Sequence, residues 1–215
     1  MNLGISNLGV DGAQYFSKIF IAKTFLLSLN LDLGSSKLSD AGAEHLSKGL
    51  ITLTNLTNLN LNIEDNNLSD TGVEHLSKAL TTLTNLSSLH LNLMDNKLSD
   101  AGAEYVTKGL TALTNLSNLN LNFGKNNLSA IGAEHLSKAL TTTLTNISSV
   151  NLYFLHNNLG DAGVEYLSKA FTSLTNLSSL YLNLWNNNLS DSGAEYLSKA
   201  LITLTNLSNL NLNLG

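Results

Sequence analysis

Residues 86–115 read LSSLHLNLMDNKLSDAGAEYVTKGLTALTN and hold one complete copy of a unit that the chain repeats. A period near 30 residues is typical of solenoids, in which each unit stacks on the next. The sequence therefore predicts a stack of coils before any single residue is interpreted. The Leu-Ser-Asp tripeptide of this unit, or a variant of it, begins at spacings of 30, 30, 30, 31 and 30 residues, at Leu38, Leu68, Leu98, Leu128, Leu159 and Leu189.

The first part of the unit alternates between apolar and polar residues. Leu89, Leu91 and Leu93 are separated by His90 and Asn92. A period of two predicts a β-strand with one buried face, because successive side chains of a strand point to opposite sides.

The second part of the unit has the spacing of an amphipathic helix. Gly102, Val106 and Leu110 lie four residues apart and are expected to face inward. Asp100 stands just before them and is the predicted N-cap of this helix. Each unit is thus expected to be a strand, a turn and a helix.

This pattern resembles the leucine-rich repeat family. The motif Leu91-x-Leu93-x-x-Asn96-x-Leu98, followed by the helix, is similar to the long, ribonuclease-inhibitor-like class and recurs along essentially the whole chain. One departure is an extra apolar residue before the usual pair, here Leu89. The resemblance implies an α/β horseshoe of about seven 30-residue coils, with a concave parallel sheet inside and helices on the convex side. It also implies a role in holding other proteins.

The repeat predicts a single domain over residues 1–215 with two atypical ends. The first coil, about residues 1–30, is irregular and carries Phe16, Phe20 and Phe25. The last strand, about residues 207–214, is expected to be an open edge. A fragment of a longer array is the favoured explanation of that edge, and end-to-end self-association through it is the other. Thr143 is the extra residue of the 31-residue unit and is expected to form a loop bulge.

We call the equivalent positions of successive coils a column. Two kinds of column have a structural interpretation. Asn residues at one position per coil are expected to form a buried ladder that satisfies loop backbone groups. Glu and Lys four residues apart on each helix are expected to form solvent-exposed ion pairs. The Asn column is Asn66, Asn96, Asn126, Asn157 and Asn187, with Ser6 and Ser36 in its place in the first two coils.

Composition narrows the classes of function. All 11 basic residues are Lys, and the net charge of −5 argues against nucleic acid or anionic membrane as the main partner. No apolar run is long enough to cross a bilayer, and no secretory signal stands at the start, which favours the cytoplasm, or delivery into a host cell if the chain is part of an effector. Cysteine is absent, and no nucleophile is placed beside a base. The chain is therefore expected to be non-enzymatic, with no catalytic residue, metal or cofactor.

Residues that break the repeat on the concave face are the candidates for binding. Most positions between the buried leucines are Asn or Gly, whereas large or aromatic side chains interrupt three of these columns. Aromatic residues on an exposed face are typical of binding hot spots. The alternative is a cross-strand cluster that only packs against itself. The predicted partner-binding residues are Tyr153, Leu155, His156, Tyr181, Trp185, His90 and Met94.

Acidic residues gather toward the start of the same face or its rim, and they could steer a basic partner. They are Asp32, Glu64, Asp65 and Asp95.

Three functions are compatible with these features. The leading hypothesis is a protein-binding scaffold whose partner of unknown identity docks on the concave face. The second is a repeat module of a larger sensor or bacterial-type effector whose activity lies outside this chain. The third is a consensus-like or engineered array with no specific partner, since the repeats are nearly identical and Pro, Cys and Arg are absent.

Overall fold

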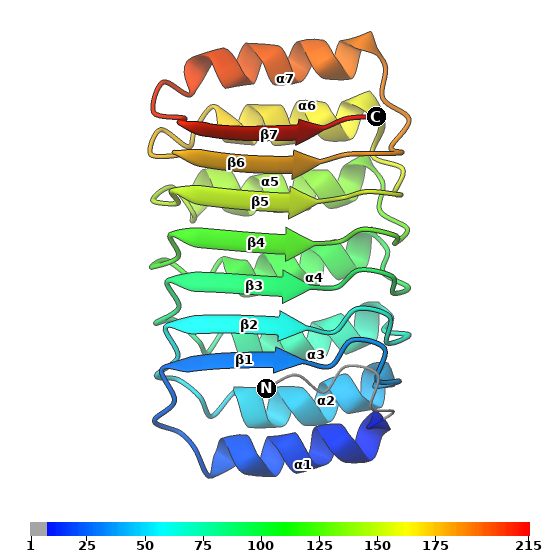
Figure 1. The fold of residues 1–215 in the computed structure, drawn as a ribbon, viewed down its shortest axis with the longest axis vertical. Coiled ribbons are helices and arrows are strands. Elements are labelled where there is room, and N and C mark those ends of the chain that lie inside the picture. Colours follow the sequence, from blue (N-terminus) through cyan, green and yellow to red (C-terminus); the bar gives the residue numbers. More distant parts are fainter. Residues whose placement is uncertain (1–7) are drawn as a thin grey trace.

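The structure is a computed structural model that describes residues 8–215 as seven helices alternating with seven strands. The strands form one parallel sheet in the order of the sequence, and every helix lies on the same side of it (Figure 1). The predicted strand–turn–helix unit and the solenoid are confirmed.

The strands repeat in strict register. Each residue pairs with the residue one period further along, so Leu59 lies beside Leu89 and Leu61 beside Leu91. The extra apolar residue of each unit, such as Leu89, therefore lies within the strand and is buried with the others. The strands are β1 (Ser28–Asp32), β2 (Asn58–Asn62), β3 (Ser88–Asn92), β4 (Asn118–Asn122), β5 (Ser149–Tyr153), β6 (Ser179–Asn183) and β7 (Asn209–Asn213).

The helices bury one stripe each against the sheet. In α4, Gly102, Val106 and Leu110 are buried as predicted. The helices are α1 (Gly9–Ile21), α2 (Ser39–Leu50), α3 (Asp70–Leu80), α4 (Asp100–Leu110), α5 (Ala130–Thr142), α6 (Gly160–Phe171) and α7 (Asp191–Thr203).

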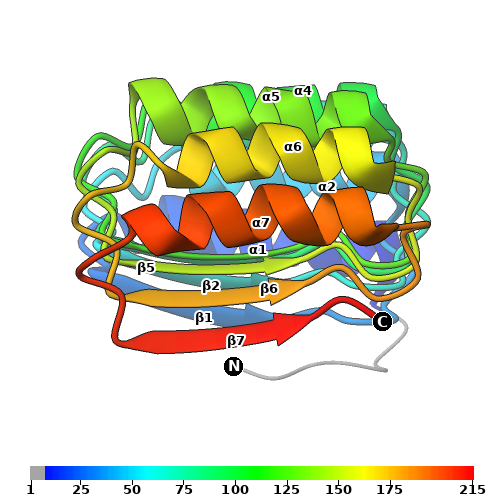
Figure 2. The ribbon, with the colours of Figure 1, turned by 90° about the horizontal axis from the view of Figure 1, so that it is seen from above.

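The stack is bowed with the sheet on its inner side. Figure 2 shows that β1 and β7 lie further from the helices of the middle coils than β5 does, so both ends bend toward the sheet side. Parallel strands are spaced by about 4.8 Å, whereas packed helices need about 8–10 Å, so the helical layer must spread further than the sheet. The sheet is consequently concave, and its outward-facing columns line the hollow side.

The predicted N-cap is wrong. Ser99, not Asp100, caps α4, because its side chain accepts a hydrogen bond from the Ala101 N–H. The Asp100 carboxylate instead reaches the next coil, where it accepts hydrogen bonds from the N–H and hydroxyl of Ser129 at 2.8 and 2.6 Å. The backbone N–H of Gly132 donates to the same carboxylate at 2.8 Å.

We call this contact between coils the Asp–Ser clasp. It is present four times, and in each case the Ser that it binds is also the N-cap of its helix. A Cβ on Gly132 would lie 2.7 Å from the Asp100 carboxylate, which explains a glycine here. The clasp is missing before α6, where Ala130 and Gly160 replace both partners. The four clasps join Asp40 to Ser69, Asp70 to Ser99, Asp100 to Ser129 and Asp161 to Ser190.

The predicted asparagine ladder is confirmed. The Asn96 amide nitrogen donates to three carbonyls, of Ile63, Leu93 and Met94, and its oxygen accepts the N–H groups of Asn66 and Leu68. Each ladder residue therefore satisfies backbone groups of its own coil and of the preceding one. Where Ser36 replaces Asn, it makes one long side-chain bond, 3.4 Å to the Gly34 carbonyl, and Ser6 lies outside the described residues.

The convex side carries the predicted ion pairs. Six Glu–Lys pairs at i,i+4 join atoms 2.5–2.9 Å apart, from Glu44–Lys48 to Glu195–Lys199, and all are solvent-exposed. Thr143 does not form a loop bulge. The extra residue instead prolongs α5 to Thr142, and Thr143 is its C-cap.

The end coils expose apolar residues that inner coils bury. Phe16 and Phe20 lie in the core, but Phe25 is 89% exposed. On the last strand Leu210 is 49% exposed, whereas its neighbour Leu180 on β6 is 1% exposed.

Candidate functional site

The aromatic residues of β5 and β6 meet on the concave face. Tyr153 is the last residue of β5. Tyr181 lies at the centre of β6, beside Asn151, which is two residues before Tyr153. Their ring centroids are 4.7 Å apart, with the planes tilted by 30°. Burial raises the pKa of Tyr153, the charge of Tyr181 adds to this effect, and a hydrogen bond with Asn120 opposes it. The Tyr153 phenol is therefore neutral at physiological pH, and the two residues present ring faces and hydroxyl groups.

A second ring pair lies on the rim, in the loops that follow the same two strands. The His156 and Trp185 centroids are 4.5 Å apart in an edge-to-face arrangement. His156 has a positive φ of 54°, and its Nδ1 lies 2.8 Å from the Asn186 amide nitrogen. Trp185 is 43% exposed, although its loop is fixed by a hydrogen bond from its N–H to the Asn183 side chain.

We call Tyr153, Leu155, His156, Tyr181 and Trp185 the aromatic patch. Leu155 bends toward the preceding coil, where a Cβ on Gly124 would approach its Cδ2 to 2.4 Å. The structure thus brings the predicted residues of these two coils together, as two ring pairs on the concave face and its rim.

His90 and Met94 do not contact these ring pairs. They belong to the coil of β3, and β4, with Asn120 and Asn122, runs between them and β5. Burial lowers the pKa of His90. The Asn122 amide nitrogen contacts the Met94 sulfur at 3.7 Å.

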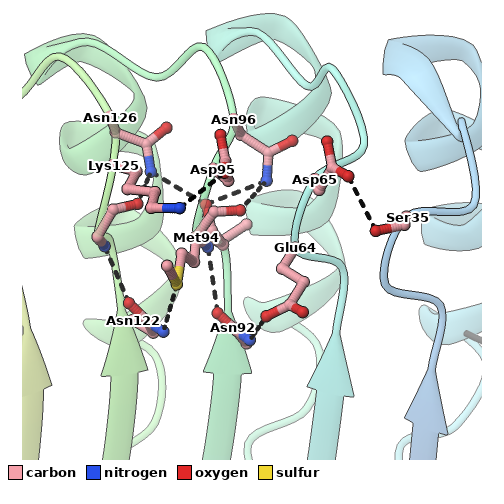
Figure 3. Close-up of polar contacts among 12 residues, drawn as sticks. Ser35, Glu64, Asp65, Asn92, Met94, Asp95, Asn96, Asn122, Lys125 and Asn126 are labelled. Carbon is pink, nitrogen blue, oxygen red and sulfur yellow. Dashed lines mark hydrogen bonds and ion pairs between the residues drawn. The ribbon is translucent and has the colours of Figure 1, made fainter.

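The predicted acidic residues are engaged along the first coils (Figure 3). Glu64 accepts a hydrogen bond from the Asn92 amide at 2.7 Å, and Asp65 accepts one from the Ser35 hydroxyl at 2.9 Å. Asp95 lies 3.4 Å from the Lys125 ammonium group. Asp32, outside the labelled residues of that view, accepts the Asn62 amide at 2.8 Å. These carboxylates therefore already have partners within the chain.

Sequence reasoning missed how the concave asparagines are bonded. In β2, β3 and β4, the last Asn of the strand accepts the N–H two residues on and donates its amide to a side chain of the preceding coil. The signal was available, since an Asn at a strand end followed by a turn is typical of this local hydrogen bond. The donors are Asn62 to Asp32, Asn92 to Glu64 and Asn122 to Met94.

Two polar hollows border the aromatic patch. One, of about 440 Å³, lies on the rim and is lined by residues that include Asn127, His156, Asn158 and Asn186. The other, of about 460 Å³, lies on the concave face around Tyr181. A hollow of about 260 Å³ between α6 and α7 lies on the opposite side of the molecule.

Comparison with known families decides the assignment. A family model described as Leucine Rich repeat matches residues 53–77, 81–106 and 175–198. The chain is a leucine-rich repeat protein. Its seven coils have the parallel sheet and outer helices of this fold. Assignment to the ribonuclease-inhibitor-like class stays a prediction.

Two solved structures resemble this leucine-rich repeat chain. Internalin C2 from Listeria monocytogenes is 21% identical, with a TM-score of 0.49, and the match covers 95% of this chain and 76% of that one. An internalin from the same organism, inlF, is 20% identical, with a TM-score of 0.36, and the match covers 88% of this chain and 62% of that one. The comparison with curated proteins gives no match.

The described repeats hold no group of three or more His, Cys, Asp and Glu residues arranged to bind a metal ion. Among the helices described in residues 8–215, none has the length and apolarity needed to cross a membrane. The outer column of His and Tyr lies on the helices, where Lys108 covers the Tyr105 ring at 5.2 Å.

Proposed function

We propose that this leucine-rich repeat protein is a non-enzymatic scaffold that holds a partner protein on its concave face, centred on Tyr153, Tyr181 and Trp185. The observation that carries the proposal is the pairing of Tyr153 with Tyr181, and of Trp185 with His156, in adjacent coils of a surface on which most positions are Asn or Gly. Aromatic side chains give a large contact area with few rotatable bonds, and combinations of Tyr, Trp, Ser, Asn and Gly are enriched in antibody paratopes.

Rigidity of the surface supports the same proposal. The loops that carry Trp185 and His156 are bonded to each other, since the His156 N–H donates to the Trp185 carbonyl at 2.9 Å. A partner that docks here orders few side chains, so little conformational entropy is lost. The acidic rim is proposed to steer basic groups of that partner and to affect association rate more than affinity. A cytoplasmic location is part of the proposal.

Alanine substitution at the rings tests the scaffold. A partner is first captured from the cells that make the protein, and its affinity is then measured by calorimetry with Trp185→Ala and Tyr181→Ala. Each variant is expected to lose about 2 kcal/mol or more of binding free energy. Asn60→Ala is the matched control, because Asn60 occupies the column of Tyr181 four coils earlier. Changes of less than about 0.5 kcal/mol at both rings would refute the site.

A second proposal is end-to-end self-association through β7. Leu210 is exposed on this edge strand, whereas Leu180 is buried in the coil before it. Sedimentation of the wild type over a range of concentrations, beside Leu210→Lys, tests this idea. A concentration-dependent dimer that the substitution abolishes is expected, and a wild type that stays monomeric at the highest concentration contradicts it.

A further inference from the structure

The side chains of the concave face carry no formal charge from β4 onward. Ligands with charged groups would therefore meet no counter-charge there, whereas the earlier coils carry Asp32 and Glu64 on the same face. The one nearby ammonium group on the rim, of Lys125, is paired with Asp95. The uncharged columns are Asn120, Asn122, Gly124, Asn151, Tyr153, Leu155, Tyr181, Asn183, Trp185, Asn211, Asn213 and Gly215.

The aromatic patch also interrupts the asparagine bonding that earlier coils complete. Asn92 donates its amide to Glu64, but Leu155 occupies the equivalent position for Asn183 and offers no acceptor. The Asn183 oxygen still accepts the N–H two residues on, from Trp185, but within residues 8–215 no side chain of the preceding coil accepts from its amide nitrogen, which stays accessible to solvent or a ligand. On the other side of β5, the buried Asn120 side-chain oxygen receives no hydrogen bond from the described chain.

An accessible amide nitrogen and a buried, unmatched oxygen thus flank Tyr153. Buried polar groups are rarely left without a partner in native proteins, so such groups point to a ligand or water that completes them. A hydroxyl group both donates and accepts, and it carries no charge. Ligands rich in hydroxyl groups can satisfy both amides without bringing a charge onto an uncharged face.

The adjoining hollows have the same chemistry. Amides of Asn127, Asn158 and Asn186 line the rim hollow, and Asn151, Asn211 and Ser208 line the concave one. Asn127 and Asn211 are exposed and Asn151 is partly exposed, so a ligand can reach their amides. The rim hollow has a volume of about 440 Å³ and the concave one about 460 Å³, and both lie in the usual range for ligand sites, roughly 300–1,000 Å³.

We propose that the aromatic patch and its two hollows bind an uncharged oligosaccharide, either free or attached to the partner protein. The exposed ring of Trp185 and the partly exposed rings of the tyrosines stack on the C–H faces of the sugar rings, and the amides bond the sugar hydroxyl groups. Apolar side chains of a ligand would leave the amides unsatisfied, and an anionic glycan would find no cation. The inference rests on the proposed function only in that both use the same surface.

A glycan array with neutral and anionic members tests the ligand class, and Trp185 fluorescence then measures affinity for the best neutral glycan, because Trp185 is the only Trp of the chain. Neutral glycans are expected to bind and to shift the Trp185 emission. Leu155→Glu recreates the acceptor that Glu64 gives to Asn92 and adds a charge, so it is expected to weaken binding at least about tenfold. Met94→Glu makes the same kind of change two coils earlier and is expected to leave affinity within about twofold.

Asn186→Gly gives a second test, because the substitution is compatible with the backbone conformation at this position. Asn186 and Asn67 are both exposed, and both have a φ of 56°, which glycine adopts without steric cost. Asn186→Gly is expected to weaken glycan binding several-fold, and Asn67→Gly is not. Absence of neutral glycan binding, equal binding of anionic glycans, or equal losses in the paired variants would overturn the inference.

Enzymatic deglycosylation of a captured partner separates this inference from the proposed function. Loss of binding after deglycosylation supports a glycan carried by the partner. Undiminished binding that still depends on Trp185 keeps the scaffold and overturns a glycan carried by the partner, and the array result then decides whether a free glycan binds.

Discussion

Asp100→Ala removes one Asp–Ser clasp from the middle of the stack. The carboxylate accepts three hydrogen bonds, from the N–H and hydroxyl of Ser129 and from the N–H of Gly132. Hydrogen bonds to a charged group contribute about 1.5–3 kcal/mol each when sheltered, and about 1 kcal/mol when solvent competes. Because Asp100 is half-buried, we expect a total loss of about 3 kcal/mol in the free energy of unfolding. For a chain of this size that corresponds to roughly 6–12 °C in Tm.

Urea unfolding followed by circular dichroism measures this loss. Asp191→Ala is the matched control, because Asp191 occupies the same column of the last coil and no following coil is described for it to bind. Its substitution is expected to cost less than about 1 kcal/mol, from the helix N-terminus alone. If Asp100→Ala and Asp191→Ala cost the same within about 0.5 kcal/mol, the clasp does not hold the coils together.

Three further predictions concern single columns. Asn96→Ala is expected to cost about 3–5 kcal/mol in urea unfolding, because it leaves five backbone groups of two coils without their partner, and a cost below about 1 kcal/mol would contradict the ladder. Burial lowers the pKa of His90 below its ordinary value of 6.5. Between the two pKa values the unfolded chain binds a proton that the folded chain does not, so the free energy of unfolding falls as the pH drops below 6.5. His90→Asn, which installs the usual residue of this column, is therefore expected to reduce the change in unfolding free energy between about pH 7.5 and about pH 5.5, and an identical pH profile would refute the assignment. Lys108→Ala is expected to leave the urea unfolding midpoint almost unchanged, with any difference vanishing in high salt, because its pair with Glu104 is exposed, and a clear loss that persists in high salt would be inconsistent with this.

The period and the apolar spacing were enough to predict the coil. Leu89 and Leu91 fix the strand, Val106 and Leu110 fix the helix, and the buried Asn96 column follows because the loop backbone needs partners. The strand and the helix could be predicted because each depends on residues within one unit, and the ladder could be predicted because Asn recurs at the same position of successive units.

Contacts between units were harder to predict. The Leu-Ser-Asp motif was visible, but Asp100 was assigned to its own helix, because nothing within one unit shows that its carboxylate bonds Ser129 in the next. The pairing shows only when the coils are stacked. The joint replacement of Asp by Ala130 and of Ser by Gly160 agrees with it, since both partners of that clasp change together.

The sequence predicted which residues form the candidate site better than it predicted how they are arranged. Departures from the column default identified Tyr153, Tyr181 and Trp185. The sequence could not show that the rings form separate pairs, because that depends on side-chain rotation in the loop of His156. It also placed His90 and Met94 with them, although an entire strand lies between.

Reversion of the aromatic patch to the column default tests the central claim most directly. The variant Tyr153→Asn, Leu155→Gly, Tyr181→Asn and Trp185→Gly keeps the repeat and removes only what departs from it. The proposed scaffold predicts an unchanged far-ultraviolet circular dichroism spectrum and an affinity for the partner at least about 100-fold weaker, measured by calorimetry. A folded variant that binds the partner within about threefold of the wild type would contradict it.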